Sequence, residues 1–318
     1  MRTYFQLLLL LLAFHFGYAK NIDPSFTESS LILETKTGKL YGSLCIPNHY
    51  KKGAIVLLIA GSGPTDRNGN SGLTKNNALL QLAHQLADSG IASFRFDKRG
   101  IGESAGAIKK EEDLIFDDYI SDVSDWMALL KKDKRFNKLI IAGHSEGSLI
   151  GMIAASRKTD LFISISGAGE PIDQTLKRQL AKQPDTIKNK SYSIIDSLKQ
   201  GHLVKDVPLL LYSLFRPSVQ PYLINWFKRN PQIEVAKLKI PALIIQGNKD
   251  LQVSEDDAKM LHDASPNSKL VIIDNMNHVL KTVSDEKDNY KSYKDANRHL
   301  HPELIKVIVG FIKQHSKG

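Results

Sequence analysis

Residues 140–150 read Ile-Ile-Ala-Gly-His-Ser-Glu-Gly-Ser-Leu-Ile, an apolar, β-prone run that passes into a helical run through Gly-x-Ser-x-Gly. A strand-to-helix turn this tight forces its central residue, Ser145, into a strained backbone conformation. The flanking glycines have no Cβ, so the strand and the helix can approach closely. The Ser145 hydroxyl is therefore expected above the sheet. The N–H of Glu146 is expected in the first helical turn, where donors are unpaired and favour negative charge.

This stretch predicts a nucleophilic serine together with half of an oxyanion hole. The alternative is an ordinary strand–helix turn that contains a serine by chance. The context favours the first interpretation, because residues 138–142 have the composition of a strand and residues 148–155 that of a helix.

Outward from this turn, apolar runs of strand length alternate with amphipathic runs of helix length. Strands are predicted at residues 54–60, 92–96, 138–142, 161–166, 241–245 and 269–274. Helices are predicted at residues 75–88, 114–130, 148–155, 254–262 and 302–314. An antiparallel hairpin is predicted at residues 31–35 and 40–46, and a surface loop at residues 282–298. The alternation predicts an α/β fold with a mostly parallel central sheet, helices on both faces and right-handed crossovers.

The alternation stops between residues 170 and 238, where the pattern favours helices and no strand is convincing. We expect a helical cap at 170–238, inserted into a core domain formed by residues 20–169 and 239–318. Three aromatic side chains of the cap are candidates to line an apolar substrate pocket: Tyr212, Phe215 and Trp226. The alternative for each of them is packing between the cap and the sheet.

Two further polar residues follow predicted strands, Asp250 and His278, so they share the carboxyl edge of the sheet with Ser145. A serine hydroxyl needs a base, which His278 can provide near neutral pH, and Asp250 can orient the imidazole. As alternatives, Asp250 can cap the loop before the next helix and His278 can be a structural loop histidine. The other histidines are interpreted as surface or helix residues, namely His84, His144, His202, His262, His299, His301 and His315.

The glycine-rich loop at residues 61–70 follows a central strand and lacks the spacing of a phosphate-binding loop. The N–H of Ser62 is the expected second donor of the oxyanion hole, with Gly63 as the alternative donor, and a long surface turn is the structural alternative. The run Asp-Lys-Arg-Gly-Ile-Gly-Glu-Ser at residues 97–104 is interpreted as a turn with polar bracing near the nucleophile.

Residues 1–19 are predicted to be a signal peptide, with Arg2, an apolar run at 7–16 and cleavage after Ala19. The mature chain is then exported, periplasmic or secreted, without stable membrane insertion; an uncleaved anchor is the alternative. The formal net charge is +9, but the lysines are scattered, so no nucleic-acid partner is predicted. The single cysteine, Cys45, excludes an intrachain disulfide and is expected to be buried.

Taken together, these residues resemble the α/β-hydrolase superfamily from about residue 31 to the C-terminus. The runs at 61–70, 97–104 and 143–147 resemble bacterial secreted esterase-like members grouped with serine aminopeptidase-type hydrolases. The resemblance implies Ser145, Asp250 and His278 as a catalytic triad and the amides of Ser62 and Glu146 as the oxyanion hole. It implies no cofactor, and no metal site is predicted. One departure is Ala60-Gly61, where many members have His-Gly.

The function expected is hydrolysis of carboxylic esters through an acyl-serine intermediate, with a small-molecule ester of short to medium acyl or aryl groups as substrate. A serine aminopeptidase, an amidase or a thioesterase with the same triad is the alternative. The cap offers few acidic groups that could bind a substrate amine, which disfavours the aminopeptidase. The non-enzyme alternative is a binding protein on a retained hydrolase fold, which a missing triad member would favour. The sequence favours no oligomeric state.

Overall fold

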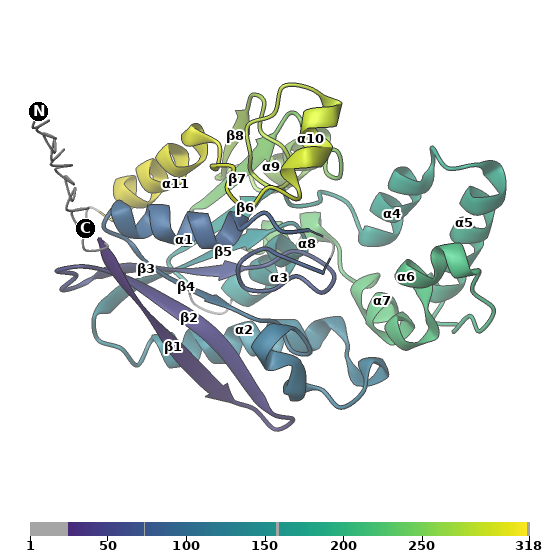
Figure 1. Ribbon diagram of the computed structural model, residues 1–318, viewed down its shortest axis with the longest axis horizontal. Helices are drawn as coiled ribbons and strands as arrows, with labels where there is room; N and C mark the ends of the chain where they lie inside the picture. The colour runs from purple at the N-terminus through teal and green to yellow at the C-terminus, as the bar shows by residue number, and fades with distance from the viewer. Residues whose placement is uncertain (1–24, 73, 157–158, 317–318) are drawn as a thin grey trace, which may run out of the picture.

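A computed structural model of the protein describes residues 25–316, apart from residues 73, 157 and 158. The predicted signal peptide at residues 1–19 lies outside the described residues. The described chain forms an eight-stranded sheet in the order β1-β2-β4-β3-β5-β6-β7-β8 (Figure 1). The strands are β1 Phe26–Glu34, β2 Lys39–Pro47, β3 Gly53–Ile59, β4 Ala92–Phe96, β5 Phe136–His144, β6 Leu161–Ile165, β7 Ala242–Gly247 and β8 Lys269–Ile273. The six strands from β3 to β8 pair in parallel, which confirms the predicted sheet.

The opening hairpin is also confirmed and is longer than predicted. β1 pairs antiparallel with β2, so that Leu33 faces Leu40, and β2 continues antiparallel onto β4. Cys45 of β2 is completely buried, and burial raises the pKa of its thiol to about 12. It is therefore a small packing residue, as the sequence predicted.

The central strands are apolar along their whole length because helices cover both faces of the sheet. Successive residues of β3 alternate between two apolar clusters: Val56 and Leu58 belong to one, and Leu57 belongs to the other. The first cluster packs against α1 (Ala78–Asp88) and α11 (Pro302–Gln314). The second packs against α2 (Phe116–Leu130), α3 (Glu146–Ala155) and α9 (Glu255–Ala264), the same two-sided arrangement that Figure 1 shows.

The insertion between β6 and β7 is helical, where the sequence predicted a cap. It contains α4 (Ile172–Leu180), α5 (Asp185–Lys199), α6 (Tyr212–Phe215), α7 (Gln220–Trp226) and α8 (Pro231–Ala236). Helices α4 to α7 extend beyond the carboxyl ends of the parallel strands, whereas α8 returns to pack against α3 and α9 (Figure 1). The division of the chain into two domains stays a prediction.

The prediction of a surface loop at residues 282–298 is wrong, because this segment contains the helix α10 (Glu286–Ser292). Asp285 accepts a hydrogen bond from the N–H of Asp288 and caps the helix. The buried side of α10 presents Asn289 and Ser292, which are polar. The helix therefore has no apolar stripe by which a hydrophobic pattern could reveal it.

Short 3₁₀ helices lie in the loops, at Gly102–Ala107, Glu111–Asp113, Leu209–Leu211 and Pro217–Val219. Within the part of the chain that the structure describes, no helix is both long enough and apolar enough to cross a membrane.

Candidate active site

Ser145 lies in the turn between β5 and α3 with φ 55° and ψ −121°, a strained conformation for a residue with a side chain. The residues at 143 and 147 must be glycine, because other backbone atoms lie where a Cβ would stand. A Cβ on Gly143 would lie 2.1 Å from the Gly147 carbonyl oxygen, and one on Gly147 would lie 2.4 Å from the Ile59 carbonyl oxygen. The Ser145 N–H donates to the Ile165 carbonyl at 2.9 Å, which fixes the turn on the neighbouring strand.

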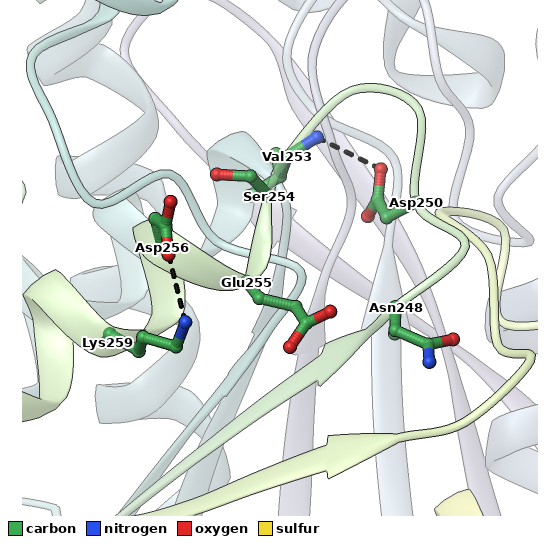
Figure 2. A pocket seen from close by; sticks show the side chains of 8 residues that line it. Asn248, Asp250, Val253, Ser254, Glu255, Asp256 and Lys259 are labelled. Carbon is green, nitrogen blue, oxygen red and sulfur yellow. Dashed lines mark hydrogen bonds and ion pairs between the residues drawn. The ribbon is translucent and has the colours of Figure 1, made fainter.

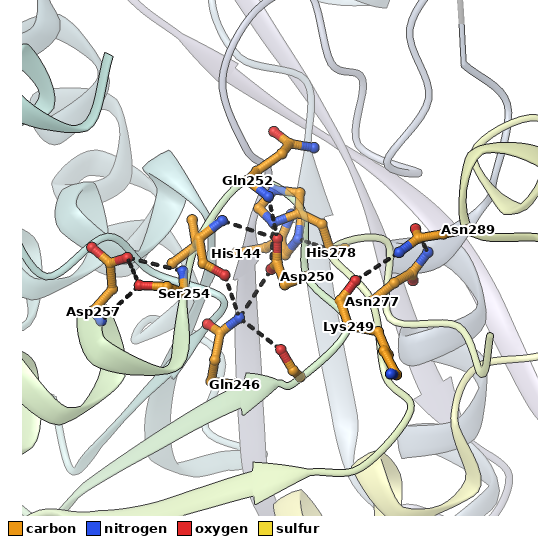
Figure 3. Close-up of polar contacts among 12 residues, drawn as sticks. His144, Gln246, Lys249, Asp250, Gln252, Ser254, Asp257, Asn277, His278 and Asn289 are labelled. Atoms are coloured by element: carbon orange, nitrogen blue, oxygen red, sulfur yellow. Dashed lines mark hydrogen bonds and ion pairs between the residues drawn. The ribbon is translucent and has the colours of Figure 1, made fainter. Parts of the chain in front are cut away.

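His278 and Asp250 form a direct contact at the same edge of the sheet (Figure 3). His278 Nδ1 lies 2.7 Å from Asp250 Oδ2, and both side chains are buried. Asp250 also accepts hydrogen bonds from Gln246 Nε2 at 3.1 Å and from the N–H groups of Gln252 and Val253 at 2.8 and 3.0 Å. This arrangement orients the imidazole, because Nδ1 donates to the carboxylate and Nε2 stays available as a base.

The ionisation of Asp250 results from two opposed effects. Burial raises the pKa of the Asp250 carboxyl, but the charge and hydrogen bond of His278 and the two backbone N–H groups lower it more. The net result is a pKa below the ordinary value. Asp250 is therefore a carboxylate at neutral pH and can stabilise a cationic imidazole.

His144, the residue before the nucleophile, contacts the loop that carries His278. Its Nε2 donates to the His278 backbone carbonyl at 2.8 Å, and the two rings lie 4.9 Å apart. Burial, reinforced by the charge of His278, lowers the pKa of His144 to about 4, so the ring is neutral at physiological pH. Interpreting His144 as a surface or helix residue is therefore wrong. The described residues show no hydrogen bond between Ser145 Oγ and His278 Nε2, a contact that catalytic sites often tighten only with substrate.

A second polar network lies behind Asp250 and His278 (Figure 3). Asn277 Nδ2 donates to Asn289 Oδ1 at 2.8 Å and to Ser292 Oγ at 2.6 Å. Asn289 Nδ2 in turn donates to the Lys249 carbonyl at 2.6 Å. Helix α10 thus joins the loop before Asp250 to the loop before His278. Sequence reasoning missed this network because it expected α10 to be a loop.

The loop after β3 lies against the nucleophile. A Cβ on Gly61 would be 3.2 Å from Ser145 Cβ and 3.3 Å from His144 Nδ1, so Gly61 approaches both residues closely. The predicted polar bracing by the 97–104 loop is present. Asp97 accepts hydrogen bonds from the Arg67 N–H at 2.7 Å and from the Glu103 N–H at 2.9 Å. The bracing joins the 97–104 loop to Arg67 of the glycine-rich loop, whose Gly61 approaches Ser145.

Comparisons with known proteins bear on this geometry. Residues 74–203, less than half of the chain, match the family model "Serine aminopeptidase, S33". The esterase EstD of Thermotoga maritima is 27% identical over 272 residues, which are 81% of this chain and 61% of the relative. The chain thus spans less than two thirds of that relative's length.

Solved structures resemble the whole described fold. Est1E from Butyrivibrio proteoclasticus has 18% identity and a TM-score of 0.60, with 90% of this chain and 98% of that chain covered. The Pyrococcus furiosus esterase Pf2001 has 18% identity and a TM-score of 0.61, with 93% and 94% covered. The α/β hydrolase GrgF from a Penicillium species has 14% identity and a TM-score of 0.60, with 92% and 100% covered. The protein has the α/β-hydrolase fold.

A cavity of about 410 Å³ lies between the cap and the core, beside the expected oxyanion donors. Both Ser62 and Glu146 line it, and its other walls are largely apolar. The apolar lining includes Ile101, Ile108, Leu114, Leu176, Leu214 and Leu223. Trp226 also lines it, but Tyr212 and Phe215 do not. Tyr212 is 46% exposed and Phe215 is completely buried within the cap, so the pocket prediction is corrected for these two residues.

A second, polar hollow of about 330 Å³ is lined by Asp250 and by the start of α9 (Figure 2). Asn248, Ser254, Glu255, Asp256 and Lys259 contribute to its walls. Figure 2 shows Lys259 directed at Asp256, and the two form an ion pair at 3.0 Å. This hollow is polar and contacts neither expected oxyanion donor, so the cavity beneath the cap is the better site for an apolar ligand.

Proposed function

We propose that the protein is a serine hydrolase that cleaves carboxylic esters through an acyl-serine intermediate. The observation that supports this most strongly is the contact between His278 and Asp250, 2.7 Å long, beside the strained turn at Ser145. Serine, carboxylate and histidine in this chain order on the α/β-hydrolase fold are the residues that acyl transfer requires. The similarity to an esterase from Thermotoga maritima favours the same activity.

In the proposed mechanism, Ser145 Oγ attacks the ester carbonyl carbon while His278 Nε2 accepts the hydroxyl proton. The negative oxygen of the tetrahedral intermediate accepts hydrogen bonds from the N–H groups of Ser62 and Glu146. When the intermediate collapses, the bond to the alcohol breaks and the imidazolium gives its proton to the leaving oxygen. Water then repeats the sequence on the acyl-serine, which releases the carboxylic acid and restores Ser145.

The cavity supports an ester with a short to medium acyl or aryl group. It borders the expected oxyanion donors rather than His278, so it can hold the acyl side of a substrate while the alcohol leaves on the histidine side. Its apolar walls stabilise hydrocarbon by burial of surface.

The match to the serine aminopeptidase family makes hydrolysis of aminoacyl amides the second candidate. A peptidase that trims N-termini needs an acidic group free to bind the substrate's ammonium. The two carboxylates that line the cavity already have partners. Glu111 contacts Arg216 and Ser218, and Glu146 contacts Lys98 and Tyr222. These contacts favour the esterase over the aminopeptidase.

A fluorophosphonate probe on the purified mature chain tests the proposal, with mass spectrometry to locate the modified residue. Labelling at Ser145 that is lost on denaturation and in Ser145→Ala is the expected result. Panels of p-nitrophenyl esters, feruloyl esters and aminoacyl amides then separate the two candidates. A folded chain that takes no label and hydrolyses no ester would favour the binding-protein alternative.

We also propose that the chain is exported after removal of residues 1–19, because Arg2, the apolar run at 7–16 and the small residues before Lys20 have the pattern of a secretory signal. N-terminal sequencing of the protein produced in a bacterial host tests this. A mature chain that starts at Lys20 is expected, and a chain that retains residue 1 in the cytoplasm contradicts the proposal.

A further inference from the structure

A buried ion pair lies directly behind the expected oxyanion hole. Lys98, from the loop after β4, has its Nζ 2.9 Å from Oε2 of Glu146, the first residue of α3. Both side chains are only 1% exposed. Stability alone gives a weak reason for such a pair, because removing two charges from water cancels much of their attraction. Its position suggests another role.

Lys98 makes a second contact that connects it to the oxyanion loop. Its Nζ donates to the Gly61 carbonyl oxygen at 2.6 Å. That carbonyl belongs to the same peptide group as the Ser62 N–H. In a planar trans peptide the C=O and the N–H point in opposite directions. By binding the carbonyl on one side, Lys98 therefore directs the Ser62 N–H to the other side.

The charge of Lys98 also acts through this peptide. A hydrogen bond from an ammonium group to a carbonyl is stronger than a neutral one and polarises the peptide group. A polarised peptide is a better N–H donor to a developing oxyanion. If the peptide turned over, the Gly61 oxygen would face the reaction centre and repel the negative charge.

The cap completes the cluster. The Tyr222 hydroxyl, from α7, donates to the other carboxylate oxygen of Glu146. Burial, and then the charge of Glu146, raises the pKa of Tyr222, so its hydroxyl stays protonated as a donor. The Tyr119 ring lies 4.9 Å from Lys98 Nζ and adds a cation–π contact. Glu146 is thus held at both oxygens, one from the core and one from the cap.

We propose that Lys98 is a positioning residue that holds the Gly61–Ser62 peptide in the donor orientation of the oxyanion hole. In this role Glu146 of α3 holds the lysine in place, and Tyr222 of the cap holds Glu146. The consequence for catalysis rests on the proposed function. The same ion pair joins the two expected oxyanion donors, since Glu146 also supplies its own backbone N–H to the hole.

The test compares Lys98→Met with the double variant Lys98→Met/Glu146→Gln. The single variant leaves a buried carboxylate without its cation and is expected to lose stability. The double variant removes both charges, and the introduced amide keeps an oxygen that can accept from Tyr222, so its Tm is expected near that of the wild type. Its kcat for a p-nitrophenyl ester is expected to fall roughly 10- to 100-fold with KM changed by less than about threefold.

A purely structural role predicts the opposite result for the double variant, namely recovery of both Tm and kcat. A double variant with kcat within about threefold of the wild type overturns the proposal. Arg178→Met is the matched control, because Arg178 is a cap cation that contacts the buried Asp257 carboxylate at 2.6 Å, away from the oxyanion loop. Its Tm is expected to fall while kcat stays within about threefold of the wild type.

Crystal structures of the wild type and the double variant separate this proposal from the proposed function. A wild type that hydrolyses no ester contradicts the esterase, and the orientation of the Gly61 carbonyl then decides the role of Lys98. A carbonyl that turns in the double variant supports positioning by Lys98. An unchanged carbonyl overturns it.

Discussion

The loops around Asp250 and His278 and the helices of the cap are held in place by different forces. Asp250 accepts four hydrogen bonds, and Asn277 behind it donates two to α10. The cap helices pack some of their apolar side chains against one another and leave other apolar side chains exposed to solvent. Leu209 is 90% exposed and Leu210 is 71% exposed.

The difference has a physical consequence. Hydrogen bonds are directional, so the loops of the sheet edge fix the orientation of an imidazole and a carboxylate. Apolar packing is non-directional and responds mainly to buried area, so the cap defines a volume rather than an orientation. If the protein is the proposed ester hydrolase, the core would orient the reacting groups and the cap would accept a range of acyl groups.

The polar contacts between the cap and the core also differ in how firmly they are held. Arg229 with Asp117 and Arg216 with Glu111 join the cap to the core, but their side chains are 30–40% exposed. Exposed pairs of this kind contribute about 0.2–1 kcal/mol each. The contact of Tyr222 with Glu146 is buried, so it ties the cap to the core at the expected oxyanion hole.

The largest expected effect is on kcat, from a substitution in the hydrogen-bonded loop that carries Asp250. Asp250→Asn replaces the carboxylate by an amide, so His278 loses the acceptor that fixes its tautomer and the charge that stabilises its cation. We expect kcat to fall about 10⁴-fold while the fold is retained. Steady-state hydrolysis of a p-nitrophenyl ester, with thermal unfolding as the control, measures this. A fall in kcat of less than about tenfold would contradict the contrast between loops and cap, because the hydrogen bonds of the Asp250 loop would then not govern catalysis.

On the cap side, Trp226→Ala removes a large ring that stacks on Phe116 at 5.4 Å and lines the cavity. We expect the free energy of unfolding to fall by about 4 kcal/mol, since truncating a buried tryptophan leaves a void. KM for medium-chain esters is expected to rise more than kcat falls, which a series of acyl lengths measures. A drop in kcat equal to that of Asp250→Asn would show that the cap also orients the reacting groups.

His144 provides a test through pH. Its pKa is lowered to about 4 by burial, so between its ordinary pKa of 6.5 and 4 the unfolded chain binds a proton that the folded chain does not. Stability is therefore expected to fall as the pH decreases through this window, by roughly 3 kcal/mol in total. Denaturant unfolding of the wild type and of His144→Asn at several pH values measures the difference. An equal pH dependence in both proteins would contradict the assignment of a half-buried, neutral His144.

The smallest effect is expected at the surface of the cap. Leu209→Ser/Leu210→Ser replaces two exposed side chains and should change the free energy of unfolding by no more than about 0.5 kcal/mol. Urea unfolding and hydrolysis of a soluble ester provide the measurements. A large loss of stability in this double variant would show that these leucines are covered by a second molecule in solution.

Much of the fold was predictable because its signals are local. The alternation of strands and helices, the opening hairpin and the helical insertion each follow from the periodicity of a short segment. Helix α10 was not predictable in this way, since its buried side bonds through Asn289 and Ser292 rather than through apolar contacts. The cavity was predicted only in part, because the exposure of Tyr212 and the burial of Phe215 depend on how the cap helices pack.

The sequence by itself determined the tight turn at Ser145 and the order in which serine, aspartate and histidine follow their strands, because strand ends and glycine turns are set by neighbouring residues. Only the tertiary structure decided that His144 binds the His278 backbone and that Lys98 contacts Gly61 and Glu146, 37 and 48 positions away. Charged and polar partners at such separations leave no periodic pattern in the chain. They meet only when the sheet aligns the ends of its strands, and that alignment depends on the packing of the whole core.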